Sequence, residues 1–216
     1  MSRVAKTRIP YLTEIALSKG VRFLAGVDPD LRRIVEEFGP PPIWARETGF
    51  PTLIHIILEQ QVSLASARAA FNRLRDVASP LTPHRFLELN DDTLRTAGFS
   101  RQKTGYGRQL ARSVIDGNLD FSNHHLLQDA EIRAQLTSIK GIGNWTADIY
   151  LLMALRRPDI WPRGDLALAV AVQNVKRLSA RPAQPELDAM SLQWQPWRAV
   201  AARLFWHHYL SKPRAR

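Results

Sequence analysis

The sequence predicts an all-α fold, and three observations support that prediction. Hydrophobic residues recur at three- and four-residue steps along most of the chain, which is the spacing of one helix face. No stretch shows sustained alternation of apolar and polar residues between hairpin turns. Residues that typically start or stop helices separate the periodic segments from one another.

The first half of the chain contains several such segments. The stripe in 53–75 is typical of one long helix or of a helix pair, with Pro51 and Thr52 as its expected start. Residues 81–97 read as two short helices that end at Gly98. Ser100 then opens a helix whose expected inward stripe contains four residues. They are Tyr106, Leu110, Val114 and Ile115.

The second half continues in the same way. We expect helices over 126–136 and 144–156, joined by a short glycine turn. A last stripe of hydrophobic residues between Trp197 and Tyr209 predicts a C-terminal helix. A proline run at 40–42 and the segment 181–185 are expected loops, and neither resembles a long flexible linker.

Composition narrows the possible functions. The 216 residues carry 30 Lys and Arg against 20 Asp and Glu, a net charge of +10 that is divided equally between the two halves. Such a distributed excess suits a polyanionic partner such as a nucleic acid. Because 24 of the 30 cations are Arg, a bias in the coding sequence is the alternative explanation.

Several classes of protein are excluded or disfavoured. The chain has no cysteine, so disulfides, thiol catalysis, cysteine zinc sites and iron–sulfur clusters are ruled out. No uncharged stretch approaches the roughly 20 residues that a membrane-spanning helix needs. The N-terminal region lacks the apolar core of a secretory signal, so we expect an intracellular protein without membrane association.

The most informative stretch is LTSIKGIGNWTA at 136–147, followed by RRPDIWPRGDLAL at 156–168. The glycines at 141 and 143 permit a tight turn that another molecule can approach, while Ile142 can anchor that turn on the core. The amides at the start of the next helix form a surface that binds phosphate. Taken alone, the pattern also fits an ordinary connector between two helices.

This stretch resembles the helix-hairpin-helix motif of the DNA glycosylase superfamily, and most closely the DNA-3-methyladenine glycosylase II branch. Asp165 fits the family's catalytic aspartate, 20 residues after Trp145. Segments 58–63 and 194–206 also resemble the corresponding motifs of the family, so the resemblance covers about residues 45–210. It implies two helical lobes flanking a DNA-binding cleft within one domain, 1–216. The expected lobes are 45–130, and 1–44 together with 131–216.

Three departures from the patterns of other superfamily members indicate the branch to which the sequence is most similar. Trp145 stands where the bifunctional members carry a lysine that forms a Schiff base, so we expect no lyase activity. The absence of cysteine separates the chain from the iron–sulfur members of the superfamily. The roughly 40 residues before Pro41 are too few for the N-terminal α/β domain of the enterobacterial enzyme, so we expect a minimal form.

The resemblance implies a monofunctional enzyme that flips out and hydrolyses alkylated purines, such as 3-methyladenine or 7-methylguanine, from duplex DNA in base excision repair. A carboxylate stabilises the positive charge that develops on the sugar as the base leaves, and Asp165 is the candidate. Asp165 is also well placed to cap the helix that starts at Leu166. The two roles are compatible.

Aromatic side chains are expected to hold the flipped base, because an indole face attracts a cationic purine. Trp145, Trp206 and Tyr150 are the candidates, although most tryptophans in a chain of this size pack in the core. Gln61 is the expected wedge that fills the gap in the DNA stack, and a polar helix-terminal pair is the alternative interpretation of Gln60 and Gln61.

The remaining candidates are DNA-binding residues in the hairpin, the 60–63 turn and the helix after Ser100. They are Gln60, Ser63, Arg101, Lys103, Arg108, Lys140, Gly141, Ile142, Gly143 and Thr146. Relatives suggest a monovalent cation at the carbonyls of Thr137, Ile139 and Gly141. We expect no cofactor and no catalytic metal, since the adjacent histidine pairs do not face one way on a helix.

The expected partner is double-stranded DNA that contains damaged bases, bound by a monomer inside the cell, which means the cytoplasm or nucleoid if the organism is a bacterium. A non-catalytic helix-hairpin-helix DNA-binding protein is the alternative. Asp165 and the two tryptophans argue against it, because phosphate binding needs none of them.

Overall fold

A computed structural model describes residues 10–212, and within them it contains helices and no β-strand, which confirms the all-α prediction. The described helices form two units. Unit 1 spans 46–150, and unit 2 combines 10–45 with 151–212. No helix of the described part is long and apolar enough to cross a membrane. Residues 1–9, which fall within the expected lobe 1–44, lie outside the described residues.

The predicted lobe boundary needs correction. The sequence-based division at residue 130 assigns the hairpin to the second lobe, whereas the structure places it in unit 1, which ends at Tyr150. The reason lies in the packing of the hairpin, which contacts residues of the 60–63 turn and of the helix after Ser100.

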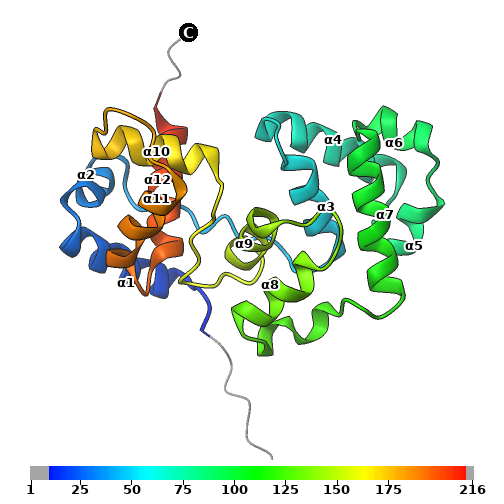
Figure 1. Cartoon of the computed structure of the whole chain (residues 1–216), viewed down its shortest axis with the longest axis horizontal. Coiled ribbons are helices and arrows are strands. Elements are labelled where there is room, and N and C mark those ends of the chain that lie inside the picture. Colours follow the sequence, from blue (N-terminus) through cyan, green and yellow to red (C-terminus); the bar gives the residue numbers. More distant parts are fainter. Residues whose placement is uncertain (1–9, 213–216) are drawn as a thin grey trace, which may run out of the picture. The chain divides into compact units, whose positions relative to one another are not determined.

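Unit 1 contains most of the short helices of the chain (Figure 1). They are α3 (Phe50–Glu59), α4 (Leu64–Val77), α5 (Pro83–Glu88), α6 (Asp91–Ala97), α7 (Arg101–Ile115), the 3-10 helix η1 (Phe121–Leu126), α8 (Asp129–Thr137) and α9 (Asn144–Met153), whose last turn continues into unit 2. Helix α7 packs against α3, α5 and α6, and α4 packs against α3 and α6.

Helix starts in unit 1 follow the local signals. Thr82, Asn90 and Ser100 each accept a hydrogen bond from a backbone amide three residues ahead, and thereby cap α5, α6 and α7. Gly98 ends α6 with a φ of 104°, a left-handed conformation that glycine adopts without strain. The two short helices predicted for 81–97 are therefore confirmed.

Two details of the helical prediction were wrong. Thr52 does not cap α3, because the helix already begins at Phe50 and the Thr52 hydroxyl donates to the Glu47 carbonyl at 2.6 Å. Ile115, expected on the inward stripe of α7, is 39% exposed. The buried face of α7 instead uses small side chains such as Gly107, against which Phe86 packs so closely that a Cβ would lie 2.5 Å from its ring.

The stripe over 53–75 proves to be a helix pair. Helix α3 is buried along nearly its whole length and ends at Glu59, and α4 begins at Leu64. The turn at 60–63 separates the two helices, and Gln61 adopts a left-handed φ of 57° within it. This turn is the segment where the wedge residue was expected.

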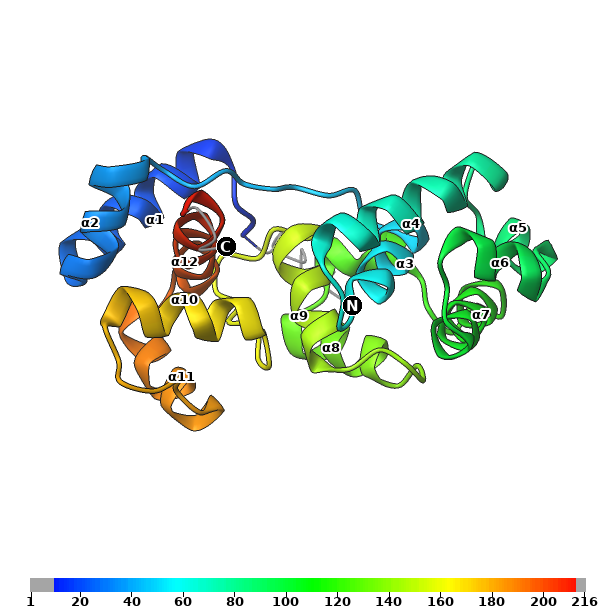
Figure 2. The ribbon, with the colours of Figure 1, turned by 90° about the horizontal axis from the view of Figure 1, so that it is seen from above.

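Unit 2 is built around the C-terminal helix, as Figures 1 and 2 show. Its helices are α1 (Glu14–Val27), α2 (Pro29–Phe38), α10 (Leu166–Lys176), α11 (Gln184–Ser191), the 3-10 helix η2 (Leu192–Trp194) and α12 (Arg198–Ser211). Helix α12 packs against α1, α2 and α10. Every residue of α12 from Ala199 to Trp206 is buried, including Arg203.

Arg203 carries a charge into the core of unit 2. Its guanidinium donates to the carbonyls of Ile43, Ala199 and Leu152 at 2.9, 3.1 and 2.8 Å. Burial lowers the pKa of Arg203 to about 9, so the side chain keeps its charge at neutral pH. These bonds attach α12 to Ile43, which follows α2 in the chain, and to the end of α9.

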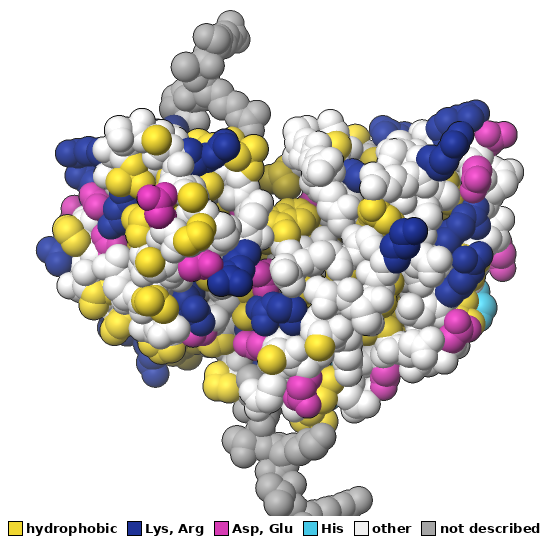
Figure 3. Space-filling view, viewed as in Figure 1, with side chains coloured by type: hydrophobic (Ala, Val, Ile, Leu, Met, Phe, Trp, Pro, Cys, Tyr) yellow, Lys and Arg dark blue, Asp and Glu magenta, His cyan; other side chains and the backbone are white. Residues whose placement is uncertain are grey.

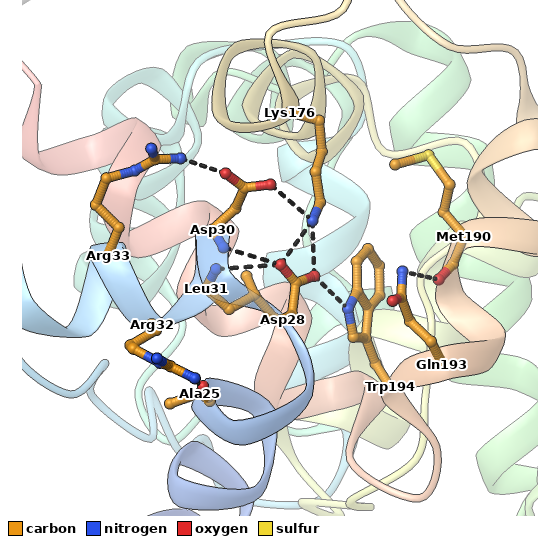
Figure 4. Close-up of polar contacts among 10 residues, drawn as sticks. All are labelled: Ala25, Asp28, Asp30, Leu31, Arg32, Arg33, Lys176, Met190, Gln193 and Trp194. Atoms are coloured by element: carbon orange, nitrogen blue, oxygen red, sulfur yellow. Dashed lines mark hydrogen bonds and ion pairs between the residues drawn. The ribbon is translucent and has the colours of Figure 1, made fainter.

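A second polar cluster joins α1, α2, α10 and η2 around Asp28 (Figure 4). The carboxylate of Asp28 caps α2, accepts two hydrogen bonds of 2.7 Å from Lys176 and accepts one of 2.8 Å from the Trp194 indole. Asp30 also binds Lys176 and pairs with Arg33. Partial burial works against ionisation of Asp30, but Lys176 and Arg33 together lower the pKa of its carboxyl group.

We predict that Asp28→Ala lowers the free energy of unfolding of unit 2 by about 3 kcal/mol, because it removes a buried acceptor of four groups at once. Urea denaturation followed by tryptophan fluorescence measures this change, since five of the six tryptophans lie in unit 2. Asp92→Ala is the control, because Asp92 forms only an exposed pair with Arg95 and its loss should leave stability nearly unchanged. If both variants change the free energy of unfolding equally, the stabilising role assigned to Asp28 is wrong.

Candidate functional site

The glycine turn lies between α8 and α9, as the sequence predicted. Ile142 is 3% exposed and its amide donates to the Ile139 carbonyl at 3.0 Å, so the side chain anchors the turn on the core. Lys140 and Gly143 are exposed on either side of it. The turn therefore presents backbone and one cation to the solvent, beside the N-terminus of α9, which is the arrangement that binds phosphate.

Gly141 cannot be replaced without moving its surroundings. Its φ is 98°, and a Cβ at this position would lie 2.1 Å from the ring of Tyr106 on α7. Glycine is therefore required both by the left-handed backbone and by the direct packing of the turn on that aromatic ring.

The hairpin also contacts the 60–63 turn. The side-chain amide of Gln60 donates to the Gly141 carbonyl at 2.9 Å and to the Thr146 hydroxyl at 3.0 Å. Thr146 is 1% exposed. Gln60 and Thr146 were predicted to bind DNA, but their side chains form hydrogen bonds within the protein. These bonds link two segments that lie more than 80 residues apart in the sequence.

Within the 60–63 turn, the Gln61 side chain is exposed. Ser63 caps α4 by accepting a hydrogen bond from the Ser66 amide at 3.2 Å. The turn is thus fixed at both ends, by Gln60 and Ser63, and it presents Gln61 in a left-handed conformation. An exposed polar side chain on a fixed turn is a suitable wedge.

The basic candidates divide into two groups. Arg101 and Lys140 are exposed. Lys103 instead donates to the carbonyls of Leu58 and Gln60 at 2.7 and 2.9 Å, and Arg108 donates to the Leu89 carbonyl and pairs with Asp91. Burial lowers the pKa of Lys103. The structure therefore assigns Lys103 and Arg108 internal contacts, which the sequence did not indicate.

Lys and Arg side chains also gather on the outer helices of unit 1. Figure 3 shows them over α4, α6 and α7. The exposed arginines on these helices are Arg68, Arg73, Arg75, Arg95, Arg101 and Arg112. Of these six arginines, only Arg101 is among the DNA-binding candidates predicted from the sequence.

In unit 2, Asp165 occupies the position directly before α10. Its Oδ1 accepts a hydrogen bond from the Leu168 amide at 2.7 Å and another from the Trp206 indole at 3.3 Å. The first bond confirms the predicted helix cap. The carboxylate is therefore held in one orientation by a helix N-terminus and by an aromatic side chain of α12.

The loop before Asp165 is anchored by residues that sequence reasoning missed. The Gly164 amide donates to the Gln184 side chain at 2.8 Å, and Arg163 pairs with Asp188 at 2.6 Å. Both acceptors lie on α11, about 20 residues further along the chain. No local pattern marks such contacts, because the loop and the helix meet only in the folded unit.

The three predicted aromatic residues differ in their environment. Trp145, on the first turn of α9, is half-buried, and Trp206 is 7% exposed with its indole directed at Asp165. Tyr150 is fully buried, packs against Phe121 and His124, and accepts a hydrogen bond from the Gly49 amide. The prediction of Tyr150 as a pocket wall is therefore corrected to a core role in unit 1. This burial raises the pKa of its hydroxyl group.

Two of the three carbonyls named for a monovalent cation already accept a hydrogen bond within the protein. The Gly141 carbonyl accepts from the Gln60 amide and the Ile139 carbonyl accepts from the Ile142 amide. A carbonyl oxygen has two lone pairs, so each of these carbonyls can accept a second partner, and the cation site stays a prediction. Among residues 10–212 there is also no group of three His, Asp or Glu side chains that could hold a metal ion.

Comparison with known proteins agrees with this geometry. A 3-methyladenine DNA glycosylase from Schizosaccharomyces pombe, solved in complex with abasic DNA, superposes with a TM-score of 0.83 at 28% identity and covers 87% of this chain and 95% of its own. A DNA-3-methyladenine glycosidase from Bacillus halodurans gives a TM-score of 0.74 at 27% identity, with 94% of each chain covered.

The curated relatives agree as well. DNA-3-methyladenine glycosylase 1 of Schizosaccharomyces pombe is 28% identical over 198 residues, which cover 88% of this chain and 87% of that protein. Residues 54–198 match the family described as HhH-GPD superfamily base excision DNA repair protein. This match spans most of the chain and includes the 60–63 turn, the hairpin and Asp165, so the chain belongs to the HhH-GPD superfamily of base excision DNA repair proteins.

Proposed function

We propose that this protein is a monofunctional DNA glycosylase that hydrolyses the bond between deoxyribose and an alkylated purine in duplex DNA. The observation that carries the proposal is the fixed carboxylate of Asp165, held by the Leu168 amide and the Trp206 indole. Several relatives in the family are named as 3-methyladenine glycosylases or glycosidases. We further propose that it acts as a monomer inside the cell.

The chemistry follows from charge. As the C1′–N bond lengthens, the sugar becomes positively charged, and an oriented carboxylate stabilises that charge more than the neutral ground state. A purine alkylated at N3 or N7 is already cationic and leaves as a neutral base. One carboxylate can therefore suffice, without a second acidic group to protonate the base.

Recognition of the lesion would use the other candidates. The glycine turn and Lys140 suit contacts to the DNA backbone, and Gln61 suits the gap that the flipped nucleotide leaves. Trp145 and Trp206 suit a cationic base, since an indole attracts a cation more than a neutral ring. Because Trp145 replaces the lysine of bifunctional relatives, strand cleavage through a Schiff base is not expected.

Asp165→Asn is predicted to slow the release of methylated purines from duplex DNA by at least about 100-fold. The amide oxygen of Asn can still accept from the Leu168 amide, so the cap and the fold should persist. Single-turnover assays on methylated DNA measure the rate, and circular dichroism checks the fold.

Asp120→Asn is the matched control for this variant, because Asp120 also caps a helix, η1, by accepting a backbone amide bond. It should retain the wild-type rate. Full activity of folded Asp165→Asn would show that the mechanism is wrong. If neither wild type nor variant releases a base while both bind DNA, the non-catalytic DNA-binding alternative gains support.

Trp206→Phe is predicted to lower the rate of base release about tenfold, because it keeps an aromatic ring but removes the indole donor to Asp165. Trp206→Leu removes the ring as well and should be slower still. The same single-turnover assay compares the two variants. If Trp206→Phe keeps the full rate, the hydrogen bond to Asp165 does not contribute and only stacking remains as a role.

A further inference from the structure

The turn that carries Gln61 is held from three directions within unit 1. It follows α3, whose last residue Glu59 is 8% exposed and binds Arg46 through two hydrogen bonds of 2.7 and 3.0 Å. This pair attaches the end of α3 to the segment that precedes it. The backbone on the N-terminal side of the turn is therefore rigidly placed.

Lys103 provides the second support. Helix ends leave carbonyl groups without partners, and a cation near the C-terminus of a helix satisfies them favourably. The Lys103 ammonium group reaches from the first turn of α7 to the carbonyls of Leu58 and Gln60, at 2.7 and 2.9 Å. These two bonds fix the backbone directly before Gln61.

Gln60 provides the third support. Its side-chain amide donates to the Gly141 carbonyl in the hairpin and to the Thr146 hydroxyl on α9. On its other side, Gly141 packs directly on Tyr106 of α7. The 60–63 turn and the hairpin are thus neighbours that share one support, α7, and one side chain joins them.

We propose that Gln60 and Lys103 are positioning residues that couple the 60–63 turn to the hairpin. As a result, the hairpin binds the DNA backbone and Gln61 inserts into the gap in a single event. The inference rests on the proposed function, since it assumes a DNA duplex with a gap at the lesion. Neither residue needs to touch DNA. Each acts by holding Gln61 in the left-handed conformation that presents it to the solvent.

The test measures DNA binding and needs no catalysis. Two duplexes of one sequence, one intact and one with a tetrahydrofuran abasic analogue, are bound to the full chain, and the ratio of their dissociation constants gives the preference for the gap. A 2-aminopurine opposite the analogue reports insertion by its fluorescence. Because no base is released, failure here and failure of the Asp165 mechanism are separate results.

The variants form a double-mutant cycle. Gln60→Met keeps the length of the side chain but removes its donors, and Gln61→Gly removes the wedge while allowing the left-handed backbone. Each single change should lower the preference for the gap about tenfold. The combined variant should lose no more than Gln61→Gly alone, since Gln60 acts through Gln61.

The inference would be overturned if the combined variant loses the product of the two single losses in preference for the gap. An unchanged preference in Gln60→Met would overturn it as well. The same holds if the wild type shows no preference for the gap. Gln193→Ala in unit 2, which removes one exposed bond to the Met190 carbonyl, is the control and should bind like the wild type. Should Gln60→Met be unfolded by circular dichroism, Gln60→Glu replaces it, because a carboxylate keeps the shape but cannot donate to the Gly141 carbonyl.

Lys103→Met separates positioning from phosphate contact. If Lys103 holds the turn, this variant lowers the preference for the gap and leaves the salt dependence of binding to intact DNA unchanged. If Lys103 contacts a phosphate instead, the slope of log K against log salt falls by about one, and the preference for the gap stays the same. The second result would overturn the role proposed for Lys103.

Discussion

The hydrogen bond from the Leu168 amide to Asp165 Oδ1 determines where α10 begins and where the candidate catalytic carboxylate lies. A helix N-terminus has amides without partners, and a carboxylate is the best available acceptor because it also interacts favourably with the helix dipole. The fold thus needs an acceptor at the position where the chemistry needs a fixed anion. Structural and catalytic demands on this residue coincide, so the carboxylate is oriented before any substrate binds.

The same constraint acts at the other helix ends that carry functional candidates. At the end of α3, an ammonium group from α7 satisfies the carbonyls that the helix leaves open. At the glycine turn, the side-chain amide of Gln60 donates to the Gly141 carbonyl. In each case a side chain from a distant segment satisfies the helix end. The functional turns are thereby ordered, although glycine makes the backbone of the hairpin turn intrinsically permissive.

The difference between local and long-range contacts at the helix ends explains how far the sequence could predict the structure. Caps at Thr82, Asn90 and Ser100, and the cap role of Asp165, depend on residues three apart, and local patterns identify them. Asp165 as a catalytic candidate came from resemblance to a known family, since many aspartates cap helices.

The contacts of Lys103 and Gln60 span more than 40 and 80 residues, and no spacing rule reaches so far. Thr146, predicted to bind DNA, and Tyr150, predicted as a wall of the base pocket, are buried for a related reason. In an isolated sequence, a polar or aromatic residue near a motif looks accessible, whereas packing within unit 1 buries both.

The net charge of +10 also has a different meaning once the contacts are known. Several cations serve the fold itself, because Arg46, Lys103, Arg133, Lys176 and Arg203 bind carboxylates or carbonyls of their own unit. A cation committed to such a contact displaces no counterion from DNA, so the total charge overstates the phosphate-binding surface. Specific recognition must then depend on the few groups that the turns expose, above all the hairpin backbone, Lys140 and Gln61. A basic composition raises general affinity for a polyanion, but the ordered helix ends determine where the DNA backbone is held.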